Sequence, residues 1–352
     1  MKIGIVLHPY GEAAPAGLGR AIYEITRSLI ERDQKNHYIV YLRTGPAILP
    51  TFAGTNWEIK ILRGGFFWLD RGLWGEKLDG CIFNTPIMPL FVKPKRSMVI
   101  VYDFAYHYFG RHFWLSQLNR FSLKKADHIV AISEYTKRET MKLFNIRPEK
   151  ISVIYLGFKN FCENSTTPPP AIPGKFFLFI GVIKERKNVL GVLQAFNELK
   201  KKGNTTHALV IVGKGVGSYY DQIISYRKEH NLENDVKMIG RVTDEELAHY
   251  YKHAEALVFP SFIEGFGFPV LEAFACGTPV ITSTTGSLPE AAGDAALLVD
   301  PADSQAIAGA MELLVSDQRL RDSLIAKGRV QMQKFSWDKT ARGYLDLLAA
   351  RT

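Results

Sequence analysis

Two glutamates and the glycine-rich segment between them are the residues of this sequence best suited to chemistry. Glu264 and Glu272 are eight residues apart, which suits two ends of an extended ligand. A carboxylate accepts hydrogen bonds from paired hydroxyls, such as those of a ribose or a hexose. Backbone amides that could approach a phosphate belong to Gly265, Phe266, Gly267 and Phe268. The segment predicts a nucleotide-sugar cradle; the alternative is two glutamates that face water.

The surrounding residues predict the elements that would present this segment. An apolar stretch, Ala256–Phe259, predicts a buried strand that ends just before it. Pro269 suits the first turn of a helix because its missing N–H has no partner there anyway, and Gly277 suits the helix end. A helix N-terminus that faces a glycine loop offers N–H groups and a positive dipole end. We therefore expect a phosphate site beside the two glutamates.

A second cluster of charged residues lies in the loop that starts at Gly181. Arg186 and Lys187 immediately precede a predicted helix over residues 189–201. A bidentate guanidinium and an ammonium beside helix N–H groups would bind a diphosphate. The alternative is an ordinary solvated charge pair.

The segment from Pro260 to Pro279, with its continuation to Gly286, resembles the E-x7-E region of retaining GT-B glycosyltransferases of family 4. The text around Arg186 and Lys187 resembles the basic R-K-N block of the same family, whose residues contact the donor diphosphate. On this resemblance, Glu264 would hold the hydroxyls of the sugar and Glu272 the ribose.

The resemblance also implies a mechanism. The anomeric configuration is retained, and the family's usual proposal is a front-face route in which the leaving phosphate helps to deprotonate the acceptor. The sequence has no D-x-D motif, so we expect no metal; Arg186, Lys187 and loop amides would stabilise the leaving diphosphate. Many relatives have Arg directly after the glycine where this chain has Val182, which leaves more of the charge to Arg186 and Lys187.

Residues at three other predicted strand ends complete the donor site. Gly17 and Gly19 follow the first strand and would let donor phosphate or acceptor approach the backbone, unless they form a plain turn into a helix. Gly213 begins a turn on the nucleotide side whose glycine spacing does not match G-x-G-x-x-G. By resemblance, Arg241 and Val242 would read the base through backbone groups.

Asp103 is the acidic residue of the first half that we assign to catalysis. It follows a predicted strand over residues 99–102, and Tyr102 stands where relatives often have His. Asp103 would orient the acceptor hydroxyl or the donor sugar, with His107 as a secondary candidate; alternatively, it caps the next turn. We assign no catalytic base.

Short apolar stretches alternate with helical patterns in both halves of the chain, which predicts α/β architecture with parallel, doubly wound sheets. The resemblance implies the GT-B fold, two Rossmann-like domains that face each other across a cleft. We expect an acceptor-side domain over residues 1–165, a proline-rich linker over 166–174 and a nucleotide-sugar domain over 175–335. A final helix over 336–352 would cross back to the first domain.

Charge and hydropathy limit the partners. The 352 residues carry a net charge of +9, which indicates an anionic partner such as a nucleotide diphosphate, a membrane or a nucleic acid. Residues 93–96 and 111–125 are basic, with aromatic residues interleaved from Tyr106 to Trp114. This stretch either contacts anionic headgroups or consists of buried rings with solvated charges. No nucleic-acid motif is present, and no apolar run is long enough for a signal peptide core or a membrane span.

The cysteines are few and scattered. Cys81, Cys162 and Cys276 form no C-x-x-C pair, so we expect neither a disulfide framework nor a zinc site, and hence a reducing compartment.

These features predict a metal-independent retaining hexosyltransferase that uses a GDP- or UDP-linked sugar, with mannose as the first candidate. Its acceptor would be a glycan or a lipid-linked molecule in cell-surface polysaccharide synthesis. We expect a cytoplasmic protein, peripheral at the inner face of the plasma membrane, with no cofactor and no nucleic-acid partner. Two alternatives stay open: a dinucleotide-dependent oxidoreductase, and a non-catalytic basic adaptor for membrane or nucleic acid on the same scaffold.

Overall fold

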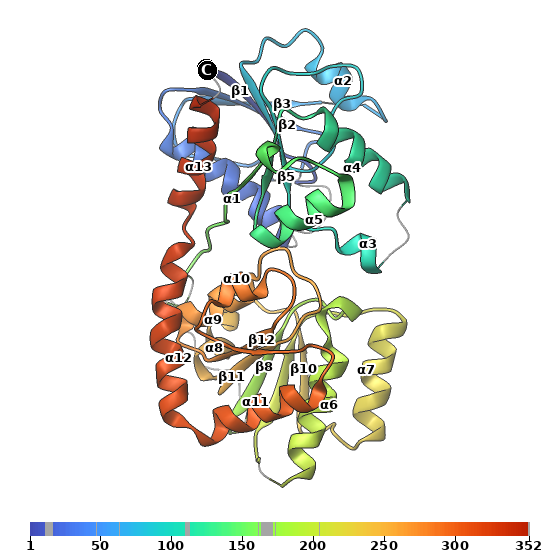
Figure 1. Cartoon of the computed structure of the whole chain (residues 1–352), viewed down its shortest axis with the longest axis vertical. Coiled ribbons are helices and arrows are strands. Elements are labelled where there is room, and N and C mark those ends of the chain that lie inside the picture. The colour runs from blue at the N-terminus through green and yellow to red at the C-terminus, as the bar shows by residue number, and fades with distance from the viewer. Residues whose placement is uncertain are drawn as a thin grey trace. The chain divides into compact units, whose positions relative to one another are not determined.

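The computed structural model describes residues 1–10, 17–46, 48–62, 64–109, 113–160, 162, 172, 174–203 and 205–350. The chain forms two compact units (Figure 1). Unit 1 comprises Met1–Gly157 and Phe335–Thr352, and unit 2 comprises Phe158–Lys334. Most of the proline-rich stretch expected to be a linker, residues 166–174, lies outside the described residues.

Unit 1 contains a seven-stranded parallel sheet with the order β3-β2-β1-β4-β5-β6-β7. The strands are β1 (Lys2–Val6), β2 (His37–Leu42), β3 (Trp57–Ile61), β4 (Gly80–Phe83), β5 (Ser97–Val101), β6 (His128–Ala131) and β7 (Ile151–Val153). The chain starts in the middle of the sheet and winds outward in both directions, as predicted for a doubly wound sheet.

The helices of unit 1 connect these strands. They are α1 (Gly17–Arg32), α2 (Trp68–Leu73), α3 (Ala105–Phe109), α4 (Phe113–Lys125), α5 (Glu134–Phe144), the 3-10 turn η1 (Pro148–Lys150) and α13 (Trp337–Ala349). Ser133 caps α5, because its side chain accepts a hydrogen bond from the N–H of Thr136.

Unit 2 contains a six-stranded parallel sheet with the order β10-β9-β8-β11-β12-β13. The strands are β8 (Phe176–Ile180), β9 (Ala208–Val212), β10 (Val236–Gly240), β11 (Ala256–Phe259), β12 (Val280–Ser283) and β13 (Leu297–Val299). Strands β8 and β11 pair with each other although three helices and two strands separate them in sequence. The order of the strands reverses at this pair, and ligands of doubly wound sheets bind beyond the carboxyl ends of such strands.

Seven α-helices and two 3-10 turns of unit 2 cover its sheet. Their bounds are η2 (Glu185–Lys187), α6 (Val189–Lys201), α7 (Ser218–Glu229), α8 (Asp244–His253), α9 (Phe268–Cys276), α10 (Leu288–Ala292), α11 (Ser304–Ser316), α12 (Gln318–Gln331) and η3 (Met332–Lys334). Helix α11 lies beside α6, with α7 on the other side of α6 (Figure 1).

Hydrophobic runs explain why these segments form central strands. All five residues of β8, Phe176–Ile180, are buried, as are all four of β11 and all four of β12. Strands that are covered by helices on both faces need such continuous apolar runs rather than an alternating pattern. The continuous apolar runs therefore suit β8, β11 and β12 to the interior of the sheet.

Helix α13 completes unit 1 from the far end of the sequence. Its residue Asp338 forms an ion pair with Arg32 at the end of α1. Thr340 donates a hydrogen bond from Oγ1 to the carbonyl of Tyr155, at 2.8 Å. A Cβ on Gly157 would lie 2.2 Å from the nitrogen of Trp337, so only glycine permits this approach of the chain to α13.

The prediction drawn from the cysteines was wrong. Cys162 and Cys276 form a disulfide across 114 residues of sequence, while Cys81 is a buried free thiol. The fold brings the first residues of unit 2 to the C-terminal end of α9, and sequence spacing gives no sign of this. The argument from cysteine spacing for a reducing compartment therefore loses its basis.

Candidate functional site

The loops after β8 and β11 meet at the point where the strand order of unit 2 reverses. After β8 the chain forms η2, and the N–H of Phe262 in the other loop donates to the carbonyl of Arg186 at 2.8 Å. The side-chain amide of Asn188 donates to the carbonyls of Pro260 and Pro301, at 3.2 Å and 2.6 Å. These bonds hold the two loops in fixed register and place their charged residues next to one another.

Glu264, which is buried, and the two predicted cations, which are half-buried, form one ion cluster. Lys187 Nζ lies 2.5 Å from Glu264 Oε1, and Arg186 Nη1 lies 3.3 Å from Oε2. Glu264 is only 8% exposed. Burial alone would raise the pKa of its carboxyl, but the charge of Lys187 and then that of Arg186 outweigh burial and hold the pKa below its usual value. Glu264 is therefore ionised in the folded protein at neutral pH.

Both cations are further constrained by unit 2 itself. Arg186 Nη1 also donates to the carbonyl of Ile263 at 3.0 Å. Lys187 Nζ lies 4.8 Å from the centre of the Phe259 ring, which is within the range of cation–π attraction. A flexible lysine and arginine are thus held in place before any ligand binds, and a diphosphate could take over contacts that Glu264 makes.

Helix α9 carries the second glutamate. Gly267 is its N-cap with φ +107°, Phe268 is its first residue and Pro269 follows. Glu272 is the fifth residue of α9 and so lies in its second turn. Its carboxylate accepts a hydrogen bond from the Tyr251 hydroxyl at 2.9 Å.

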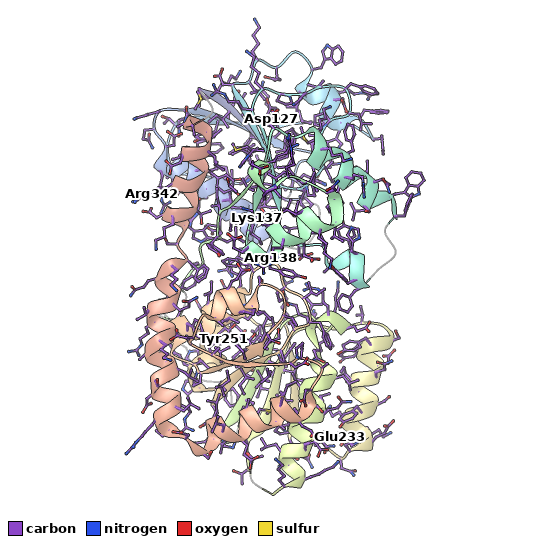
Figure 2. The ribbon with its side chains drawn as sticks, viewed as in Figure 1. Asp127, Lys137, Arg138, Glu233, Tyr251 and Arg342 are labelled. Atoms are coloured by element: carbon purple, nitrogen blue, oxygen red, sulfur yellow. A yellow bond between two sulfur atoms is a disulfide. The ribbon has the colours of Figure 1, made fainter. Side chains whose placement is uncertain are left out.

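Tyr251 keeps this carboxylate in position. Its ring is fully buried inside unit 2 (Figure 2). Burial first, and the negative charge of Glu272 second, raise the pKa of the Tyr251 hydroxyl well above its usual value, so it remains a donor. Sequence analysis missed this tyrosine, because it lies on α8 and nothing in the local sequence connects it to α9.

Two predicted glycines adjoin each other at the ends of neighbouring strands. Gly181 follows β8 with φ +146°, and Gly213 follows β9 with φ +153°. A Cβ on Gly213 would lie 1.9 Å from the carbonyl oxygen of Gly181. A side chain at position 213 would collide with the backbone at Gly181. Glycine is therefore needed at this position for packing, whether or not it also contacts a ligand.

The remaining predicted residues of unit 2 lie on loops of the same sheet edge. Gly265 and Phe266 are buried, whereas Arg241 is exposed and Val242 half-buried after β10. Thr243, next in sequence, caps α8 in a reciprocal capping box with Glu246. The structure thus brings Arg186, Lys187 and Glu264 into direct contact and places Arg241 and Val242 at a separate strand end.

The predicted residues of unit 1 lie in α1 and after β5. Gly17 and Gly19 lie in the first turn of α1, and residues 11–16 before them are outside the described residues. Asp103 follows β5, and its Oδ1 accepts a hydrogen bond from the N–H of Ala105 at 3.0 Å. This is the turn-capping contact that we considered as the alternative for Asp103. The ring of His107 packs 5.6 Å from that of Phe144, and burial lowers the pKa of the imidazole.

Ser287 supports Glu264 in a way that sequence analysis missed. Its hydroxyl and its N–H both donate to the Glu264 carbonyl, at 2.9 Å and 3.2 Å. Gly286 precedes it with φ +67°, and a Cβ there would lie 3.0 Å from the Glu264 nitrogen. The sequence shows the continuation of the E-x7-E region but not this contact. The contact forms because the chain after β12 comes back to the loop that carries Glu264.

The described residues contain neither a metal-binding group nor a helix that could span a membrane. No three His, Cys, Asp or Glu side chains gather as a metal-binding group among them. Within the same ranges, no helix has both the length and the apolar character needed to cross a bilayer.

Comparison with known proteins follows the division into two units. Residues 15–159 match the family profile described as "Glycosyltransferase Family 4", and residues 168–331 match "Glycosyl transferases group 1". O-antigen chain mannosyltransferase B of Escherichia coli is 30% identical over 276 residues, which cover 73% of this chain and 71% of the relative. Serotype-specific mannosyltransferase WbdA of Escherichia coli is 30% identical over 241 residues, which cover 66% of this chain but only 29% of WbdA.

Solved structures share the fold over nearly the whole chain. Sucrose-phosphate synthase from Thermosynechococcus elongatus gives a TM-score of 0.79 at 20% identity, with 99% of each chain covered. Anabaena HepE, solved in complex with UDP and glucose, gives 0.79 at 17% identity, with 99% of this chain and 100% of HepE covered. These likenesses confirm the predicted GT-B fold. With the profile matches and the O-antigen mannosyltransferase, they show that the chain belongs to glycosyltransferase family 4, a family of retaining, metal-independent enzymes.

Proposed function

We propose that this enzyme transfers a hexose from a GDP- or UDP-linked sugar to a hydroxyl of a glycan or lipid-linked acceptor in cell-surface polysaccharide synthesis. The observation that carries the proposal is the ion cluster in which buried Glu264 contacts both Arg186 and Lys187 at the strand-order reversal of unit 2. A nucleotide sugar has a diphosphate, which two cations can bind, and sugar hydroxyls, which a carboxylate can bind. This cluster contains the two cations and the carboxylate.

The chemical task is to stabilise the leaving diphosphate. Its negative charge grows as the glycosidic bond breaks, and preorganised cations at that position lower the barrier. Arg186 and Lys187 take this role, with the amides of residues 265–268 beside them. Glu264 then holds the sugar hydroxyls, Glu272 holds the ribose, and Asp103 of unit 1 orients the acceptor hydroxyl.

Mannose is the first candidate for the sugar. The curated relatives at 30% identity are O-antigen and serotype-specific mannosyltransferases, which favours a GDP-linked mannosyl donor. The HepE structure contains UDP and glucose, so a UDP-linked hexose is the other candidate. Gly17, Gly19, Gly213, Arg241 and Val242 would complete the donor site.

A ligand panel tests the donor class. GDP, UDP, dTDP, ADP and NAD are added to the purified protein, and the melting temperature is measured, because a ligand that binds only the folded state raises it. We expect GDP or UDP to raise it in the wild type and to lose most of this effect in Arg186→Ala. Exposed Lys184→Ala serves as the matched control and keeps the effect. Stabilisation by NAD alone would overturn the proposal in favour of an oxidoreductase.

We also propose that unit 1 docks on an anionic membrane, at the inner face of the plasma membrane. Unit 1 contains 25 Lys and Arg against 15 Asp and Glu, whereas unit 2 contains 19 against 20, so the net positive charge of the chain resides in unit 1. Among the described residues, all the exposed large aromatic side chains also belong to unit 1. Basic charge with exposed aromatic rings is the combination that binds anionic interfaces.

We call the exposed rings of unit 1 its aromatic surface: Phe66, Phe67, Trp74, Phe91, Tyr108, Phe109, Phe113, Trp114 and Phe121. Within it, Phe67 packs against Phe66 and Phe91, and Phe113 packs against Trp114. Trp114 and Phe121 lie two turns apart on one face of α4, while Ser122 and Leu123 of the same helix are buried. Lys125 at the end of α4 donates to the carbonyls of Pro89 and Leu90, both at 2.8 Å, which brings the helix to the segment that carries Phe91. Arg111 and His112 of the predicted basic stretch lie outside the described residues.

Vesicle co-sedimentation tests the docking proposal. We expect the wild type to sediment with phosphatidylglycerol vesicles, weakly with neutral phosphatidylcholine vesicles, and less at high salt. Phe91→Ser with Trp114→Ser should lower the bound fraction several-fold, whereas Val216→Ser in unit 2, which is 90% exposed, should not. Equal sedimentation of all three proteins would show that the aromatic surface does not dock.

A further inference from the structure

Unit 2 contains a polar cavity that shares no residue with the predicted donor site. It lies among the N-terminal ends of α6, α7 and α11, and its volume is about 440 Å³. This volume is in the range of small-molecule binding pockets. Its wall includes Glu185 from η2, Tyr219 from α7 and Phe262 from the loop after β11.

The chemistry of the wall favours a neutral polyhydroxylated ligand. No Lys or Arg lines this cavity, so it lacks the charge that a phosphate ligand needs. Within the described residues, the side chains of four neutral polar lining residues have no hydrogen-bond partner: Gln194, Ser218, Gln222 and Ser304. Amides and hydroxyls both donate and accept, which matches the hydroxyls of a sugar.

The aromatic part of the wall is rigid. The hydroxyl of Tyr219 accepts a hydrogen bond from the N–H of Leu190 at 3.1 Å, which ties α7 to α6 across the cavity. Asn188, also in the wall, is held by its bonds to the carbonyls of Pro260 and Pro301. Fixed rings beside free amides can contact the apolar face of a sugar ring while the amides bind its hydroxyls.

The same backbone segment connects this cavity to the ion cluster. Glu185 lines the cavity, and Arg186, the next residue, contacts Glu264. The N–H of Phe262, another wall residue, donates to the Arg186 carbonyl. A ligand in the cavity would therefore hold η2 from one side while the donor diphosphate holds it from the other.

We propose that this cavity is a second saccharide site that binds a neutral glycan chain, outside the centre at which the sugar is transferred. The assignment of the glycan as acceptor or product rests on the proposed transferase function; the binding itself does not. A transferase that extends a polymer gains from such a site because a second contact keeps the chain near the enzyme between transfers.

Saturation-transfer NMR on the full-length protein, without any donor, tests the proposal. The probes are mannotriose, maltotriose and cellotriose, and the dissociation constant is measured for each. We expect at least one of them to bind the wild type. Gln194→Ala combined with Gln222→Ala should raise its dissociation constant about tenfold, because two neutral hydrogen bonds are lost. Gln305→Ala is the matched control, since Gln305 is exposed beside Ser304 but does not line the cavity, and should stay within about twofold.

Glu264→Ala separates this site from the transfer centre. We expect the trisaccharide dissociation constant of this variant to stay within about twofold of the wild-type value, because Glu264 does not line the cavity. Three outcomes would overturn the inference: no binding of any trisaccharide, equal binding by the double glutamine variant, or loss of binding in Glu264→Ala. Transfer from a nucleotide sugar is measured separately, so a failure of the proposed function is distinguishable from a failure of the second site.

Discussion

Glu264 is paired with the very cations that we assign to the donor diphosphate. In the folded protein without ligand, its carboxylate neutralises Lys187 at 2.5 Å and Arg186 at 3.3 Å. The arrangement keeps two half-buried positive charges from facing each other unpaired, which would be costly. When a diphosphate enters, it competes with Glu264 for these cations and frees the carboxylate to accept hydrogen bonds from the sugar.

Replacing Glu264 by Gln should therefore change binding and turnover in opposite directions. We expect Glu264→Gln to bind free GDP or UDP about three- to tenfold more tightly, since the competing anion is gone. Sugar transfer should fall about a hundredfold or more, because the contact with the sugar hydroxyls is lost. Calorimetry and steady-state transfer assays measure the two effects. Glu185→Gln, on the neighbouring exposed residue, is the control for charge alone; weaker nucleotide binding by Glu264→Gln would contradict the pairing argument.

The same carboxylate gives a pH dependence of stability with a definite sign. The pKa of Glu264 is lower in the folded protein than its usual value of 4.5. The stabilisation by its ion pairs is thus complete above that usual value and is lost as the pH falls through the lowered pKa. The melting temperatures of wild type and Glu264→Gln should differ by a constant amount between about pH 6 and pH 8 and converge in acid. A difference that grows as the pH falls would contradict this account.

Residue types and spacing were enough to select Glu264, Arg186 and Lys187, but not to show that they contact one another. The two loops are separated by three strands and their helices in sequence, and only the pairing of β8 with β11 brings them together. Tyr251 and Ser287 could not be predicted for the same reason, since each contacts its glutamate from an element that is distant in sequence. The roles given to all of the candidate site residues, including Glu264, Arg186 and Lys187, stay predictions.

At the scale of elements, the continuous apolar runs predicted most of the structure well. The expected bounds of β11 and α6 agree with the structure at both ends. Strand β4, by contrast, was not predicted, because Gly80–Phe83 is short and starts with a glycine. Helix α12 was not predicted either, because its sequence is mostly polar and has few apolar residues to mark a helix face. In the structure, α12 packs against α9.

The close approach of the loops after β8 and β9 makes Gly213 a sensitive position. We expect Gly213→Ala to lower the free energy of unfolding by about 3 kcal/mol or more, because its Cβ would overlap the Gly181 carbonyl at 1.9 Å. Gly203→Ala is the matched control: φ is +70° there, but no atom lies within 4 Å of the added Cβ. Its cost should be only about 1 kcal/mol. Urea unfolding measures the free energy of unfolding of both variants. An equal loss in the two would show that backbone strain alone explains the effect of Gly213→Ala.

At the scale of the whole molecule, the disulfide ties the start of unit 2 to the helix that carries Glu272. Its sequence separation of 114 residues implies a stabilisation of about 4–5 kcal/mol at most in the chain-entropy model. We expect a reducing agent to lower the melting temperature of the wild type and to leave Cys162→Ser unchanged. Thiol titration of the native protein should detect one buried thiol, Cys81, and only after unfolding. Three thiols in protein purified without reductant would show that the bond does not form.

The interruption of unit 1 by the whole of unit 2 bears on how this protein is made. The chain leaves unit 1 at Gly157 and returns at Phe335, so α13 reaches its place against α1 only after residues 337–349 have been synthesised. Unit 2, by contrast, is encoded without a break and can fold while the polypeptide is still being translated. A nascent chain stalled before Trp337 should therefore protect the later-synthesised unit from protease and leave the earlier one open, the reverse of the usual order along a message.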